Sequence, residues 1–184
     1  KKEVQIYDYV DIQVKMLERM YQKRLNGYAT MGYKAKGDLA MDTSPDIIFD
    51  KDNFLPVFNQ DIVVAKKEIL IVSPFVRKRR TQQMMQHLNV AIGRHVHITV
   101  VTRPKKDFPE KDHIVMQRTL DLLTDNGVSV FFKTNIHQKF AVMDQKTLWY
   151  GSINLLSYGN AQESIMRIES PNITNELIKS IERL

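Results

Sequence analysis

The chain has 184 residues, a net charge of +6 and a hydrophobic content of 43%, as expected for a globular domain with room for an extra segment. It contains no cysteine, which excludes disulfides and thiolate metal sites and favours a reducing, cytoplasmic compartment. We expect neither a secretory signal nor a membrane helix, because no apolar run approaches about 20 residues. The first residue is Lys1 rather than Met, so we interpret the sequence as a piece of a longer protein or a processed chain.

The positive charge is concentrated in the middle of the chain. No Asp or Glu occurs between Ile69 and Lys106. The basic residues of this stretch that we predict to contact nucleic acid are Arg77, Lys78, Arg79, Arg80, Arg103 and Lys105. A local positive field attracts polyanions, most commonly a nucleic acid backbone. An ordinary solvated basic face is the alternative.

The N-terminal segment is expected to be separate from the rest. Residues 3–26 have apolar residues at helical spacing, and Asn26-Gly27 is a typical helix stop. Residues 27–45 hold three glycines and little periodicity, which indicates a connector. We therefore predict a helical segment and connector over residues 1–44 and the main domain over residues 45–184.

The main domain alternates predicted helices and strands. Helices are predicted over residues 53–67, 80–92, 110–127 and 172–184, and strands over 68–75, 95–102, 128–133, 139–144, 147–152 and 163–170. Strands separated by helices of about a dozen residues indicate an α/β fold with a mixed, mostly parallel sheet flanked by helices. The tight turn at residues 144–146 predicts one antiparallel hairpin near the end.

This hairpin carries polar residues at fixed offsets. His137 and Lys139 are two residues apart and therefore point to one face of a strand. The next strand ends at Gly151 and Ser152, with Asn154 just beyond, so the turn would bring all of these residues to the same end of the hairpin. Imidazole, ammonium, hydroxyl and carboxamide groups can each donate a hydrogen bond to a phosphate oxygen. Such a group of donors suits the charge that develops on a pentacoordinate phosphorus.

The spacing resembles that of the phospholipase D superfamily, the HKD phosphodiesterases. The family pattern is a His, any residue, a Lys, four residues and an Asp, followed by Gly-Ser and an Asn. Here it reads His137-Gln138-Lys139, Asp144, Gly151-Ser152 and Asn154. The resemblance covers roughly residues 45–184 and not the first 44, and it implies a phospholipase D-like fold. A relative that has kept the fold and lost the activity is the alternative.

The resemblance implies a role for each matching residue. His137 corresponds to the nucleophile that forms a phosphohistidine. Lys139 corresponds to the stabiliser of the phosphate charge, and Ser152 and Asn154 add hydrogen bonds. We expect these residues to need no metal and no cofactor.

Two acidic residues complete the predicted site. Glu163 is the match for the carboxylate that orients the histidine and fixes its tautomer. Asp144 belongs to the motif and is therefore counted with the catalytic residues, although the hairpin puts it at the turn. We expect its role there to be structural.

The chemistry requires a second histidine, because one attacks and the other protonates the leaving oxygen. None of the other histidines has a lysine two residues later; these are His87, His95, His97 and His113. Single-motif members of the superfamily form homodimers with the active site on the two-fold axis, and we predict that arrangement. A second motif in a missing upstream part of the chain is the alternative.

DNA is the expected substrate, in preference to RNA. The stretch Arg77–Arg80 follows a predicted strand, and strand ends are where α/β sheets bind ligands. The first 44 residues resemble the tail of a bacterial superfamily II helicase or restriction subunit, so we expect a nuclease module of a larger restriction, defence or helicase protein. An ordinary amphipathic docking helix is an equal alternative for that segment. A non-catalytic nucleic-acid-binding module and a phospholipid-processing enzyme are the other candidate functions.

Overall fold

The structure is a computed structural model, and it describes residues 17, 20–21, 24, 27–28, 30–32, 48–157, 159 and 162–182. Its contacts divide the chain into two units, residues 1–49 and residues 50–184. The domain boundary that the sequence suggests, after residue 44, stays a prediction.

Most of the N-terminal helix predicted over residues 3–26 lies outside the described residues. The described residues from 17 to 30 are helical, including Gly27 and Thr30. The helix gives way to a turn at Met31 and Gly32, and Gly32 has a φ of 85°, the left-handed conformation that often ends helices. The predicted stop at Asn26-Gly27 is therefore wrong, because the backbone hydrogen bond from Met31 to the Gly27 carbonyl continues the helix past it.

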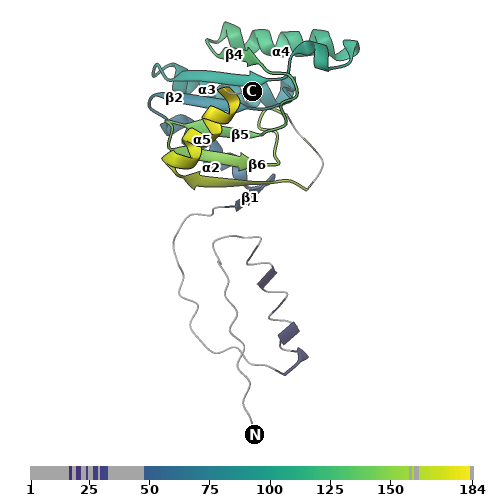
Figure 1. The fold of residues 1–184 in the computed structure, drawn as a ribbon, viewed down its shortest axis with the longest axis vertical. Helices are drawn as coiled ribbons and strands as arrows, with labels where there is room; N and C mark the ends of the chain where they lie inside the picture. The colour runs from purple at the N-terminus through teal and green to yellow at the C-terminus, as the bar shows by residue number, and fades with distance from the viewer. Residues whose placement is uncertain are drawn as a thin grey trace. The chain divides into compact units, whose positions relative to one another are not determined.

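A seven-stranded mixed sheet forms the centre of the fold (Figure 1). Its strands are β1 (Ile48–Asp50), β2 (Glu68–Val72), β3 (His97–Thr102), β4 (Ser129–Phe132), β5 (Phe140–Met143), β6 (Thr147–Gly151) and β7 (Ser164–Glu169). Their order across the sheet is β1-β7-β6-β5-β2-β3-β4. Strand β2 pairs in parallel with β3, and β3 with β4. The pairs β2–β5, β5–β6 and β6–β7 are antiparallel.

The expectation of a mostly parallel sheet is wrong, because the sheet is largely antiparallel. A parallel pair needs a long crossover between its strands. The chain supplies such crossovers through α3 (Lys78–Ile92), between β2 and β3, and α4 (His113–Asp125), between β3 and β4. Between β4 and β7 the described residues contain no helix, and a turn at residues 144–146 reverses the chain between β5 and β6. The α/β class is confirmed.

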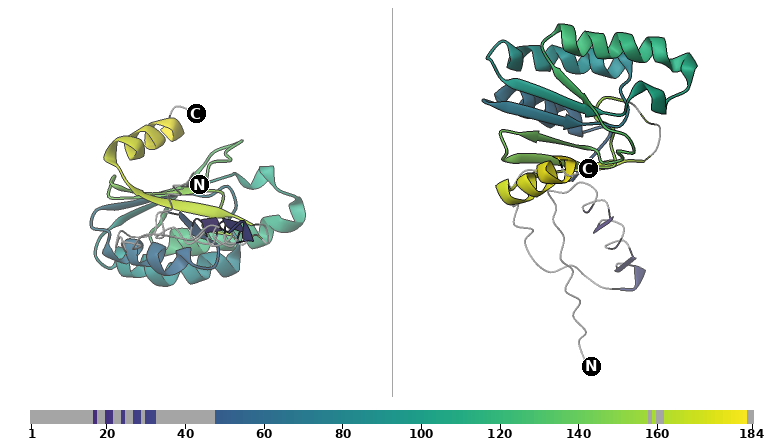
Figure 2. Two further views of the ribbon diagram at one scale, coloured as in Figure 1. Left: turned by 90° about the horizontal axis from the view of Figure 1, so that it is seen from below. Right: turned by 45° about the horizontal axis from the view of Figure 1, so that its top comes forward.

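Helices cover both faces of the sheet. Helices α2 (Phe54–Val64), α3 and α4 lie on one face, and α5 (Pro171–Glu182) lies on the other (Figure 2). The α5 face holds a core of buried residues, which are Val72, Val101, Ile136, Phe140, Val142 and Leu148, and the partly buried Leu70, Leu177, Ile178 and Ile181 pack against it. On the opposite face, Trp149 is fully buried against Phe58 of α2, with ring centroids 5.3 Å apart. None of the helices described here has the length and hydropathy of a membrane span.

The strand register brings several strand ends to one side of the sheet. Val72, at the carboxyl end of β2, pairs with Val101 of β3 and with Phe140 at the start of β5. Phe140 pairs in turn with Tyr150, near the end of β6. We call this end of the sheet the site edge. The opposite end, where β5 turns into β6, is the turn edge.

Candidate functional site

His137 and Lys139 lie at the site edge, where the chain enters β5. Ile136 is 4% exposed and Phe140 is fully buried, so the core holds both ends of this short segment. His137 is exposed and Lys139 is half-buried. The Lys139 Nζ donates a hydrogen bond of 2.8 Å to the His137 carbonyl. The ammonium group therefore lies beside the backbone of the predicted nucleophile.

Strand β6 brings Gly151 and Ser152 to the same edge. The Gly151 N–H donates to the Lys139 carbonyl at 3.3 Å, which extends the β5–β6 ladder to Lys139. A β-carbon at Gly151 would overlap the carbonyl oxygen of Ser164 on the neighbouring strand, so only glycine fits there. The Ser152 hydroxyl donates to the Ser164 carbonyl at 3.2 Å and accepts from the Ser164 N–H at 3.0 Å. The Gly-Ser pair thus fixes the start of β7.

Asn154 and Glu163 belong to the connection between β6 and β7. Asn154 is half-buried between the buried residues Ile153 and Leu155, and its Oδ1 is enclosed without a hydrogen-bond partner among the described residues. The Glu163 carboxylate lies beside Gly159, where a β-carbon would be 3.3 Å from Oε2. Within the described part of the chain, Glu163 forms no hydrogen bond with His137, and its orienting role stays a prediction.

Asp144 lies at the turn edge, at the other end of β5 from His137. Its Oδ1 accepts the N–H of Lys67 at 2.7 Å and its Oδ2 accepts the N–H of Lys66 at 2.9 Å; Glu68 donates to Oδ1 at 3.1 Å. Burial acts to raise the pKa of this carboxyl group, but the three backbone hydrogen bonds outweigh burial and lower the pKa below its ordinary value of 3.8. Asp144 therefore ties the hairpin turn to the segment between α2 and β2.

We expect Asp144→Ala to lower the free energy of unfolding by roughly 2 kcal/mol near neutral pH, because three N–H groups lose a charged acceptor. Since the folded-state pKa is lowered, this contribution is present above the unfolded pKa and is lost as the pH falls through the folded value. Urea unfolding at about pH 7 and about pH 2.5 measures the difference in the free energy of unfolding between wild type and Asp144→Ala, and this difference should be smaller at the lower pH. The exposed Asp125→Ala serves as a control, and a gap of equal size at both pH values would contradict the assignment.

The basic run at residues 77–80 divides into two parts. Arg77, Lys78 and Arg79 are exposed and follow the end of β2 at the site edge. Arg80 is 3% exposed, and its Nε donates a hydrogen bond of 3.0 Å to the carbonyl of Leu155. Only the first three side chains are therefore placed to meet a partner in solution.

The two predicted contact residues after β3 also differ in their surroundings. The Arg103 side chain is 20% exposed and pairs with Asp107 at 3.2 Å. Its guanidinium lies over the rings of Phe75 and Phe108, 5.9 and 5.4 Å from their centroids. Lys105 is exposed and donates to Gln117 at 3.2 Å. Arg103 is thus held in place by structural contacts, whereas Lys105 lies on the surface.

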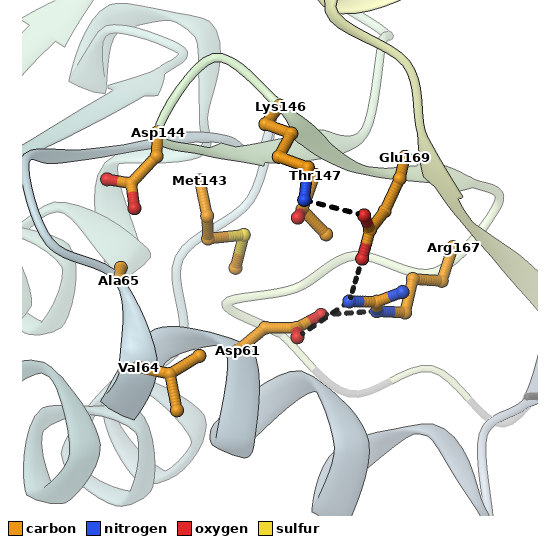
Figure 3. Close-up of a pocket in the computed structure, with 9 residues that line it drawn as sticks. All are labelled: Asp61, Val64, Ala65, Met143, Asp144, Lys146, Thr147, Arg167 and Glu169. Atoms are coloured by element: carbon orange, nitrogen blue, oxygen red, sulfur yellow. Dashed lines mark hydrogen bonds and ion pairs between the residues drawn. The ribbon is translucent and has the colours of Figure 1, made fainter.

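A pocket at the turn edge contains a charged network that the sequence analysis missed (Figure 3). Asp61 is 8% exposed and accepts hydrogen bonds from Trp149 Nε1 at 2.7 Å and from Arg167 at 2.7 and 3.1 Å. Arg167 also contacts Glu169 at 3.1 Å, and Glu169 pairs with Lys146 at 2.8 Å. The hydrogen bond with Asp61 is the main reason that the pKa of Arg167 is raised. Asp61 belongs to α2 and Arg167 to β7, so the ion pair between them crosslinks α2 to β7.

A profile described as "Cardiolipin synthase, PLD-like domain" matches residues 58–184. The chain belongs to the phospholipase D-like family. The match covers the whole sheet from β2 onwards and includes every residue of the predicted site. No curated protein sequence matches the chain significantly.

Solved structures agree with this phospholipase D-like fold. The phospholipase D family member Nuc from Salmonella typhimurium is 16% identical, with a TM-score of 0.60 over 74% of this chain and 90% of its own. NucT from Helicobacter pylori is 14% identical, with a TM-score of 0.56 over 74% of this chain and 92% of its own. TrmBL2, an archaeal chromatin protein with a novel mode of DNA binding, is 12% identical, with a TM-score of 0.50 over 92% of this chain and 66% of its own. At these identities the likeness establishes the fold alone.

Proposed function

We propose that this phospholipase D-like domain is a metal-independent phosphodiesterase that cleaves DNA through a phosphohistidine intermediate. The observation that supports the proposal most is the placement of His137, Lys139, Ser152 and Asn154 at one edge of the sheet. The β5–β6 register and the bond from Gly151 to Lys139 hold the two halves of this group side by side. An exposed imidazole at the same edge of the sheet as several hydrogen-bond donors suits attack on a phosphodiester.

The proposed reaction has two half-steps. A ring nitrogen of His137 attacks phosphorus, a P–N bond forms, and the P–O bond to the leaving oxygen breaks as that oxygen takes a proton from a second imidazolium. Water then attacks phosphorus and gives a proton to the second imidazole, and the P–N bond breaks. Lys139 and Asn154 stabilise the charge on the phosphoryl oxygens, and Ser152 does so when its O–H turns from the Ser164 carbonyl to the phosphate. Glu163 orients His137, and Asp144 acts only through the fold.

The second imidazole comes from a second copy of the chain in this proposal. The sequence contains one His-x-Lys motif, and a two-fold axis through the site would place two copies of His137 face to face. A second motif elsewhere in a longer chain is the alternative source. We propose that the domain is the nuclease module of a restriction, defence or helicase protein. In such a protein the second imidazole could come from a second copy of the chain or from a second motif in the same chain.

The surface charge supports a nucleic acid substrate. Arg77, Lys78 and Arg79 are exposed beside the site edge, and Lys105 is exposed after β3. Cations in such positions bind phosphates and make binding dependent on salt concentration. The likeness to TrmBL2, which extends over 92% of the chain, favours a second candidate, a DNA-binding module without cleavage. The cardiolipin synthase description of the family keeps phospholipid processing as a further alternative.

Incubation of the purified chain in EDTA with plasmid, single-stranded DNA, RNA and phospholipid vesicles tests the proposal. Cleavage of DNA would support the nuclease. Salt-sensitive DNA binding without cleavage would support the binding module. Turnover of vesicles alone would overturn the nuclease proposal in favour of lipid chemistry.

A further inference from the structure

We propose that Arg80 is a positioning residue for the candidate active site: its buried guanidinium holds the loop that carries Asn154 and does not contact substrate. We call residues 152–157 the asparagine loop. The effect of Arg80 on a reaction rate rests on the proposed nuclease function. The contacts by which Arg80 holds the asparagine loop do not depend on a bound substrate.

Arg80 differs from its basic neighbours in burial. It is 3% exposed, whereas Arg79 is exposed. The helical period puts Arg80 on the same face of α3 as Met84 and Leu88, which are both buried. Arginine is almost never fully buried unless it is paired. A phosphate contact would require this guanidinium to leave the core, so its partners must be internal.

Two internal partners of Arg80 lie in the asparagine loop and in α2. Its Nε donates to the Leu155 carbonyl at 3.0 Å, and its Cζ lies 5.5 Å from the centroid of the Phe54 ring. A hydrogen bond from a charged donor is roughly twice as strong as a neutral one, and burial strengthens a cation–π contact. The bond fixes the backbone one residue after Asn154.

The same segment of the chain holds the asparagine loop at two more points. The Arg77 N–H donates to the Leu156 carbonyl at 2.8 Å, and the Leu156 N–H donates to Ser73 Oγ at 3.3 Å. The side chains of Leu155 and Leu156 are fully buried. The segment between β2 and α3 therefore fixes the position of the asparagine loop, although the two are far apart in sequence.

This arrangement sets the distance between the two halves of the site. His137 and Lys139 enter β5, which pairs with β2, and the asparagine loop is tied to the segment that leaves β2. A displacement of the loop would move Asn154 relative to His137. Misplacement of a positioning group by about 1 Å can cost about 10²-fold in rate, so loss of Arg80 should slow the chemical step.

Cleavage kinetics of the full chain separate positioning from DNA contact. We expect Arg80→Met to lower kcat by about 10- to 100-fold, with KM within about twofold of wild type and an unchanged salt dependence of DNA binding. Arg80→Lys, which keeps the charge without the planar donors, should recover part of the loss. Arg79→Met should instead weaken DNA binding and reduce the salt slope by about one. Arg94→Met, the same change in an exposed arginine just after α3, should leave all of these values unchanged.

Two results would overturn the proposal. A higher KM and a reduced salt slope in Arg80→Met, as in Arg79→Met, would make Arg80 a DNA contact. An unchanged kcat would remove any positioning role. If Arg80→Met does not fold, Ser73→Ala takes its place, because it removes another hydrogen bond to the asparagine loop. Ser73→Ala should also lower kcat, by a smaller factor than Arg80→Met. A wild-type kcat in Ser73→Ala would count against the proposal.

Hydrogen exchange tests the positioning of the loop without cleavage. Arg80→Met should accelerate amide exchange in residues 152–157 and leave the protection of β5 and β6 unchanged. Unchanged exchange in the asparagine loop would overturn the proposal. If the wild-type chain cleaves no DNA, the proposed function fails, and faster exchange confined to this loop would still support the role of Arg80 in holding it.

Discussion

Replacement of His137 by asparagine is expected to abolish DNA cleavage in EDTA while DNA binding persists. Without the attacking nitrogen no phosphohistidine forms, and loss of a nucleophile costs on the order of 10⁴-fold or more in kcat. His137 is exposed, and within the described residues its ring makes no hydrogen bond, so the variant should unfold at the same urea concentration as wild type. Single-turnover cleavage and a DNA-binding titration measure the two effects separately.

A matched control uses another exposed histidine. His97 starts β3 at the end of the sheet opposite the site edge, and His97→Asn should cleave at the wild-type rate. Cleavage by His137→Asn at that rate would exclude this residue as the nucleophile.

Mixed dimers then locate the second imidazole. Wild-type and His137→Asn chains are mixed in equal amounts and allowed to exchange freely. If each site needs His137 from both copies, the mixture should keep about a quarter of the activity of the same total amount of wild-type chain, because about a quarter of the dimers carry two wild-type chains. If each copy acts independently, the mixture should keep about half.

The hairpin was predictable from the sequence because its determinants are local. Strand patterns before and after a short turn, together with the offsets of His137, Lys139 and Gly151, predict which residues reach one end of the sheet. The structure confirms the turn at residues 144–146, with β5 ending at Met143 and β6 beginning at Thr147. The position of Lys139 beside Gly151 at the site edge follows from this antiparallel register.

The sheet type was harder to predict, because the sequence does not show which strands become neighbours. Helices between β2, β3 and β4 produce the parallel part. Strand β5 instead adds to the other side of β2 in the antiparallel direction. That choice depends on which strand edge remains open in the folded chain, and no local pattern encodes it.

A run of basic residues suggests a single surface, which is why the sequence predicts Arg80 among the DNA contacts. The spacing from Arg80 to Met84 and Leu88 was an available signal, since residues four apart share one face of a helix. The ion pair between Asp61 and Arg167 left no such signal. The two residues are 106 positions apart, and only the packing of α2 against β7 brings them together.

Replacement of Asp61 by alanine is expected to give the largest loss of stability, about 3–5 kcal/mol in the free energy of unfolding. The side chains of Asp61 and Arg167 are 11% and 18% exposed, and removal of the Asp61 carboxylate leaves the largely desolvated charge of Arg167 with only the partly exposed Glu169 as its partner. Trp149 would lose its carboxylate acceptor at the same time. Urea denaturation measures the loss. A double variant, Asp61→Ala with Arg167→Met, should regain part of the stability, because the charge is removed together with its partner.

The outer end of the same network is the matched control. Glu169 is 45% exposed where it meets Lys146 and Arg167, so solvent screens these pairs and Glu169→Ala should cost no more than about 1 kcal/mol. Equal losses from Asp61→Ala and Glu169→Ala would contradict the distinction between a desolvated pair and a surface pair. Because the network lies at the turn edge, the folded Asp61→Ala variant should retain the wild-type kcat for DNA cleavage. A lower kcat in folded Asp61→Ala would show that the crosslink between α2 and β7 also affects the geometry of the site edge.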